Sequence, residues 1–237
     1  MKLLLLLFKA LKFGKLLPAV GTMLLSVAAY AWLFGWGYAV GFVALLLIHE
    51  MGHYLAARRR GLNVGLPTFI PFVGAWVQLK DLPHDAETEA YVGIAGPLLG
   101  TVGALGCFYL ARSTGSVLLL ALAYAGFFLN LFNLIPLAPF DGGRVTAAIS
   151  PRLWLIGMPL LVALFFFYSS SPLLILMAVL ALPNVMKAWQ GIRSPEEQAY
   201  YSVRAETRLS YATLYLGLAA FLAIMCEQLH AELPRAH

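Results

Sequence analysis

Residues 37–57 read GYAVGFVALLLIHEMGHYLAA, an apolar run that two histidines and an acid interrupt near its end. About 20 mostly apolar residues suffice to cross a bilayer as a helix, so this run predicts a membrane span. Ionisable side chains are costly inside a bilayer and mark functional sites when they occur there. His49, Glu50 and His53 are therefore the first functional candidates in the chain.

These three residues form the pattern H-E-x-x-H. Helical residues four apart share one face, so His49 and His53 can bind one tetrahedral zinc ion while Glu50 projects beside it as a general base. Two histidines can also simply hydrogen-bond between helices, but here that would bury three polar groups without a use. At 1.5 Å per residue, His49 lies about 13 Å inward from Arg58, so we expect a submerged metal near the membrane face that Arg58 marks.

The composition extends the membrane interpretation to the whole chain. Hydrophobic residues make up 61% of the sequence and charged residues 11%, whereas soluble domains carry about 25% charged residues. The net charge of +5 does not indicate nucleic-acid binding, because the basic residues form short clusters beside apolar runs. We expect an all-α polytopic membrane protein with six or seven transmembrane helices, near residues 16–34, 37–57, 91–111, 116–137, 153–169, 172–189 and 209–227.

The basic residues also predict sidedness. Fourteen of the sixteen Lys and Arg residues lie in segments that we place in the cytoplasm, namely 1–15, 58–60, 80, 144–152 and 187–208. The site then lies toward the cytoplasm, and the small size and strong charge bias favour a prokaryotic cell membrane. Residues 1–15 are typical of a basic amphipathic helix on the membrane surface. The alternative is a signal peptide that is cleaved near residues 29–31.

A catalytic zinc ion takes three protein ligands and keeps one position open for water, so a third ligand is required. Asp141 is the only acid between Glu89 and Glu196, and it follows two prolines that end the fourth predicted span. The glycines at 142–143 free the backbone to turn the carboxylate toward the site. A solvated loop aspartate is the alternative interpretation.

Three motifs together resemble the site-2 protease family. They are H-E-M-G-H at residues 49–53, A-G-P at residues 95–97 and N-x-x-P-x-x-x-x-D-G-G at residues 133–143. The resemblance covers most of residues 37–145. It implies regulated intramembrane proteolysis, in which a multi-pass protein in the lipid bilayer cleaves a transmembrane protein or peptide substrate.

The resemblance also implies roles for matching residues. His49, His53 and Asp141 correspond to the ligands of one zinc ion per chain, Glu50 to the catalytic acid and base, and Asn133 to a contact with the scissile peptide. Asn130 lies one helical turn before Asn133, and we expect it to hydrogen-bond between helices instead.

Residues 67–79 are apolar and rich in strand-forming types, but proline and glycine break them too often for a spanning helix. They resemble the short membrane-associated β-hairpin that the family places near its active site. Proline is tolerated there only at an edge or a bend.

The expected organisation is a surface helix over residues 1–15, a membrane-embedded protease domain over 16–190 with a catalytic core at 37–145, and a cytoplasmic linker with a C-terminal transmembrane helix over 191–237. The rival function is a non-catalytic membrane scaffold or transport protein that binds a metal. Glu50 argues against the rival, because a purely structural metal site does not need it.

Overall fold

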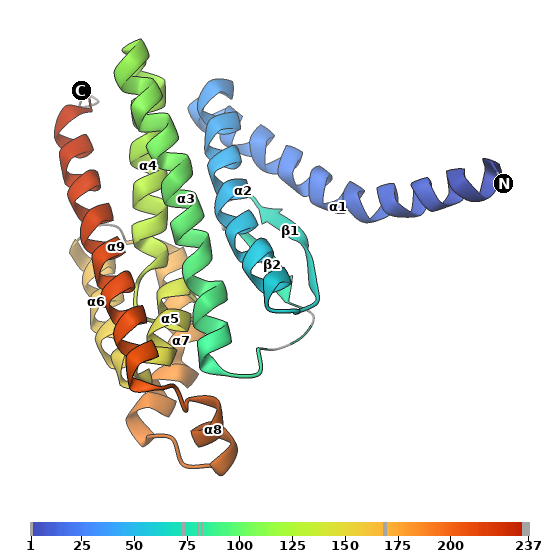
Figure 1. The fold of residues 1–237 in the computed structure, drawn as a ribbon. Coiled ribbons are helices and arrows are strands. Elements are labelled where there is room, and N and C mark those ends of the chain that lie inside the picture. The colour runs from blue at the N-terminus through green and yellow to red at the C-terminus, as the bar shows by residue number, and fades with distance from the viewer. Residues whose placement is uncertain (1, 73, 80, 82, 168–169, 234–237) are drawn as a thin grey trace.

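The computed structural model describes residues 2–72, 74–79, 81, 83–167 and 170–233, and it is mostly helical (Figure 1). The prediction of a helical membrane protein with one small hairpin is confirmed. The elements in chain order are α1 (Lys2–Phe34), α2 (Trp36–Arg59), β1 (Val64–Ile70), β2 (Gly74–Leu79), α3 (Ala86–Thr114), α4 (Val117–Asn133), α5 (Asp141–Ile149), α6 (Trp154–Phe167), α7 (Pro172–Gln190), α8 (Pro195–Tyr200) and α9 (Ala205–Glu232).

Five of the described helices are long and apolar enough to cross a membrane: α1 from Leu17 onward, α2, α3, α7 and α9. The helix α4 and the segment Pro151–Phe167 are apolar but shorter. A total of six or seven spans therefore stays a prediction. The helix α1 runs without a break past residue 15, where a separate surface helix was expected to end.

Small residues let the central helices approach closely, as is usual for helices in membranes. A Cβ atom at Gly52 of α2 would collide with the carbonyl of Ala95 on α3, and one at Gly96 would collide with the ring of His53. Further along α3, a Cβ atom at Gly100 would collide with the side chain of Asn130 on α4. The helix α3 therefore lies directly against α2 and α4, two of the three helices that carry polar residues of the predicted site.

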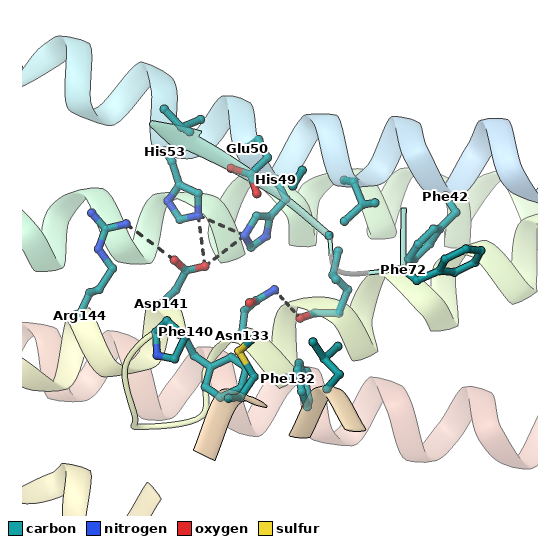
Figure 2. A pocket seen from close by; sticks show the side chains of 18 of the residues that line it. Phe42, His49, Glu50, His53, Phe72, Phe132, Asn133, Phe140, Asp141 and Arg144 are labelled. Atoms are coloured by element: carbon teal, nitrogen blue, oxygen red, sulfur yellow. Dashed lines mark hydrogen bonds and ion pairs between the residues drawn. The ribbon is translucent and has the colours of Figure 1, made fainter. Parts of the chain in front are cut away.

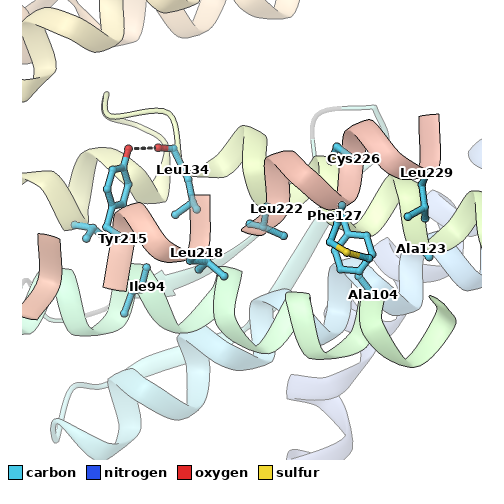
Figure 3. Close-up of a cluster of buried hydrophobic side chains, with 12 residues drawn as sticks. Ile94, Ala104, Ala123, Phe127, Leu134, Tyr215, Leu218, Leu222, Cys226 and Leu229 are labelled. Atoms are coloured by element: carbon cyan, nitrogen blue, oxygen red, sulfur yellow. Dashed lines mark hydrogen bonds between the residues drawn. The ribbon is translucent and has the colours of Figure 1, made fainter. Parts of the chain in front are cut away.

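The helix α9 closes the other side of this core. Its buried side chains pack against α3 and α4 in one hydrophobic cluster, in which Leu222 and Leu229 of α9 meet Phe127 and Ala123 of α4 (Figure 3). The hydroxyl of Tyr215 on α9 donates a hydrogen bond to the carbonyl of Leu134, just beyond the end of α4. The C-terminal helix thus supports the turn that follows α4.

The strands β1 and β2 pair antiparallel, with Phe69 opposite Ala75 and Pro67 opposite Val77. The strand β1 begins at Val64, three residues before the predicted start of the hairpin. The outer edge of β1 lies against α1, because the N–H of Phe69 donates to the Thr22 hydroxyl at 3.3 Å.

That bond sets the direction of the peptide groups in the hairpin. Because the N–H of Phe69 points away from β2, Phe69 and Ala75 form a pair without mutual hydrogen bonds. The next such pair, two residues along, is Pro67 with Val77, and proline has no N–H to offer its partner. The peptide groups of Ala75 and Val77 therefore face the outer edge of β2.

Replacing Gly52 by alanine should lower the free energy of unfolding in detergent, because the new methyl group meets a backbone carbonyl that cannot rotate away. We expect a loss of about 1–3 kcal/mol. Gly106→Ala is the matched control, since nothing lies within 4 Å of its Cβ position. It should be neutral or slightly stabilising. Equal unfolding curves for the two variants would contradict the close contact between α2 and α3.

Candidate metal centre

Two helices bring three buried ligand atoms together. The Nε2 atoms of His49 and His53, one turn apart on α2, lie 3.1 Å from each other, and each lies 3.1 Å from Oδ2 of Asp141 at the start of α5 (Figure 2). Ligand atoms at 2.0–2.1 Å from a tetrahedral zinc ion are about 3.3 Å apart. The observed triangle therefore fits such an ion, and all three side chains are buried.

The second nitrogen of each ring decides which atoms can accept a metal. Nδ1 of His53 lies 2.8 Å from the carbonyl of Val92, which only accepts hydrogen bonds, so Nδ1 carries the proton. Nδ1 of His49 lies 2.8 Å from Oδ1 of Asn130, whose amide nitrogen donates to the carbonyl of Gly126 at 2.7 Å. In the neutral imidazoles both Nε2 atoms are then left as acceptors.

Three acceptors, one of them a carboxylate oxygen, repel one another when nothing positive lies among them. Burial strengthens the repulsion, because little water is present to screen it. A cation bound by the three atoms would remove this repulsion. Imidazole nitrogen and carboxylate oxygen are ligands that suit tetrahedral zinc. His49, His53 and Asp141 therefore form a cluster that is able to bind a metal ion.

The local sequence around Asp141 explains how its carboxylate returns to α2. The helix α4 ends at Asn133, and a turn containing Pro136 and Pro139 leads into α5, whose first residue is Asp141. The two following glycines, which were expected to free the backbone for this turn, belong to the first turn of α5. Cβ atoms there would collide with the backbone of residues 134–138, so the glycines permit a close approach instead.

Glu50 lies beside the cluster and is 5% exposed. Its Oε2 has no hydrogen-bond partner among the described residues. It lines a cavity of about 370 Å³ together with the three cluster residues and Asn133. An unpaired buried carboxylate oxygen that faces a cavity is suited to accept a proton or to hold a water molecule there.

Asn133 faces the same cavity, and its amide nitrogen donates to the carbonyl of Leu129 at 3.0 Å (Figure 2). Asn130 is the asparagine that contacts the cluster, and its expected interhelical bond is the one to His49.

The sequence did not single out Val92 or Arg144 as parts of the site. Val92 contributes only a backbone carbonyl, for which a sequence gives no signal. Nη1 of Arg144 lies 3.9 Å from Oδ1 of Asp141. The signal that was available for Arg144 is its position three residues after Asp141, on the same face of a helix.

Comparisons with known proteins agree with this geometry. Residues 37–117 match the family described as Peptidase family M50. The putative zinc metalloprotease Rip3 of Mycobacterium tuberculosis is 36% identical over 132 residues, which cover 51% of this chain and 33% of the relative. Zinc metalloprotease MJ0392 of Methanocaldococcus jannaschii is 32% identical over 120 residues, or 47% of this chain and 34% of the relative.

The matched region is thus about a third of the length of these curated relatives. Among solved structures, the site-2 protease from Methanocaldococcus jannaschii aligns with a TM-score of 0.46 and 24% identity, over 73% of this chain and 87% of that one. The resemblance to the site-2 protease family is confirmed by the family match and by the relatives named as zinc metalloproteases.

Replacing Asp141 by asparagine should strongly reduce zinc content, because a neutral amide is a poorer ligand than a carboxylate. Zinc per chain in detergent-purified protein, measured by elemental analysis, checks this. Asn133→Ala is the control, since that side chain lines the cavity without touching the three ligand atoms. If Asp141→Asn kept full zinc, the third ligand would have to be sought elsewhere.

Proposed function

We propose that this chain, whose residues 37–117 match Peptidase family M50, is an intramembrane zinc metalloprotease that hydrolyses peptide bonds of transmembrane proteins near the cytoplasmic face of the membrane. The observation that carries the proposal is the triangle of buried acceptors beside the unpaired carboxylate of Glu50. The relatives' names support a zinc metalloprotease. The apolar helices support a multi-pass membrane protein.

Each residue has a role in the proposed reaction. His49, His53 and Asp141 hold the metal, and the chemistry that zinc supplies at such a site is activation of water and polarisation of the scissile carbonyl. Glu50 takes a proton from the attacking water and passes it to the leaving amine. Asn133 offers an amide hydrogen to the oxygen that gains negative charge in the transition state.

A substrate helix must unwind before it is cut, because its peptide groups are engaged in its own hydrogen bonds. Unpaired peptide groups in lipid cost several kcal/mol each, so the unwound segment needs new partners. The outer edge of β2 offers the peptide groups of Ala75 and Val77, and both residues line the cavity that contains Glu50. We assign the unwound substrate to this edge as an added strand.

The proposed sidedness rests on where the basic segments lie. The end of α2 with Arg58–Arg60, the end of α7, helix α8 and the start of α9 gather at the lower end of the bundle in Figure 1. An excess of Lys and Arg at one end is typical of the cytoplasmic side. We also assign the protease domain to residues 16–190, with α9 as a supporting helix that packs into its core.

Glu50→Gln should abolish cleavage of a transmembrane substrate while zinc stays bound, because Glu50 accepts the proton and is not a ligand. The expected loss of turnover is about 10²–10⁴-fold. Membrane fragments from cells with the native chain are compared with those from cells with the variant, alongside zinc content. His49→Ala is the contrasting variant and should lose the metal as well. Undiminished cleavage by Glu50→Gln would leave the rival function, a metal-binding scaffold or transport protein.

Ala75→Pro and Val77→Pro should each reduce cleavage, because each removes one outward N–H from the edge of β2 to which the substrate strand is proposed to add. A lost hydrogen bond of about 1 kcal/mol corresponds to roughly fivefold, and more in a dry site. Ala75→Val keeps the N–H and should retain cleavage. Zinc content should be equal in all three, since the ligands lie on other elements. Native cleavage rates in both proline variants would rule out strand addition at this edge.

A further inference from the structure

Arg144 lies between two carboxylates, those of Asp141 and Glu89. Its Nη1 lies 3.9 Å from Oδ1 of Asp141 (Figure 2), and its Nε lies 3.8 Å from Oε1 of Glu89 on α3. The other oxygen of Asp141, Oδ2, is the one that faces the two histidines. The two oxygens of this carboxylate thus have different neighbours.

Glu89 is itself held by a residue outside the cavity that contains Glu50 and the three ligand residues, which we call the metal cavity. Its Oε2 accepts a hydrogen bond of 2.6 Å from the hydroxyl of Tyr200 on α8. Burial and the adjacent Glu89 carboxylate raise the pKa of Tyr200, so the phenol stays protonated and remains a donor. An unbroken series of polar contacts therefore runs from Asp141 through Arg144 and Glu89 to Tyr200.

Arg144 also connects two cavities. It lines the metal cavity and a second cavity of about 500 Å³, whose wall includes Glu89 and Tyr200. Lys187 and Glu197 line the second cavity as well and form an ion pair of 2.7 Å that ties α8 to α7. That pair holds the same helix without contacting Arg144, which makes it a natural control.

We propose that Arg144, Glu89 and Tyr200 are positioning residues that orient the Asp141 carboxylate so that a single oxygen faces the metal. The inference rests on the proposed metal site and adds residues to it. A carboxylate can bind a metal through one or both oxygens, and the partners of its free oxygen decide which. With Arg144 attracting Oδ1, the carboxylate offers Oδ2 alone and leaves room for water at the fourth position.

Loss of Arg144 should change the metal affinity in one direction if its charge alone matters and in the other if it orients Asp141. The inference can therefore be tested. Removing a positive charge near a divalent cation strengthens cation binding if geometry is unchanged. Loss of a group that orients a ligand instead weakens binding, typically by about 10–100-fold. The sign of the change therefore separates the two roles of Arg144.

The test uses the full chain in detergent, loaded with Co²⁺, whose visible spectrum reports coordination geometry. We expect Arg144→Met to weaken Co²⁺ binding by about tenfold or more and to lower the visible absorption, as the site gains a fifth ligand. Glu89→Gln and Tyr200→Phe should shift the spectrum in the same direction by smaller amounts. Both substitutions nearly preserve the size of the side chain. They therefore test the inference even if Arg144→Met does not fold.

Glu197→Gln is the matched control, because it breaks the other ion pair of α8 and should leave both the affinity and the spectrum as in the native chain. Unchanged or tighter Co²⁺ binding with a native spectrum in the Arg144, Glu89 and Tyr200 variants would overturn the inference. Metal binding is measured without substrate. Failure of the proposed protease function, seen as absent cleavage by native protein, is therefore a separate result.

Discussion

The buried repulsion among two imidazole nitrogens and a carboxylate oxygen is the constraint on which the rest of the structure depends. Each ring is fixed by a partner at its far nitrogen, Val92 for His53 and Asn130 for His49. Those partners are positioned in turn by the close contact of α3 with α2 and α4, which only glycine permits. The helix packing therefore holds three acceptor atoms in a place where one cation can bind all of them.

The membrane imposes a second constraint, because backbone groups in lipid need partners within the protein. The helix α1 provides them on one side of the hairpin, where hydroxyls of Thr22 and Tyr30 accept from the N–H groups of Phe69 and Phe72. On the opposite strand, β2, Ala75 and Val77 line the cavity that contains Glu50. One helix thus determines which edge of a two-stranded sheet is available.

The sequence was informative where an ionisable residue stood in an apolar run, because burying such a residue in a bilayer is energetically costly. His49, Glu50 and His53 were predicted on that ground, and the structure places Asp141, the isolated acid after two prolines, beside them. The helical fold also followed from hydropathy, whereas the hairpin was predicted from the resemblance to the site-2 protease family. The ion pair of Arg144 with Glu89 could not be predicted, because it depends on how α5 lies against α3. The short length of α4 likewise reflects a turn that hydropathy does not resolve.

The hydrogen bond from Tyr215 to the carbonyl of Leu134 bears on how the protein is made. Leu134 opens the turn that carries Asp141, and its carbonyl is paired by a helix more than eighty positions later in synthesis. The ribosome therefore delivers both histidines and the aspartate to the membrane well before the helix that secures the turn. The turn that positions Asp141 is therefore complete only once α9 has been made and has packed against the helices before it.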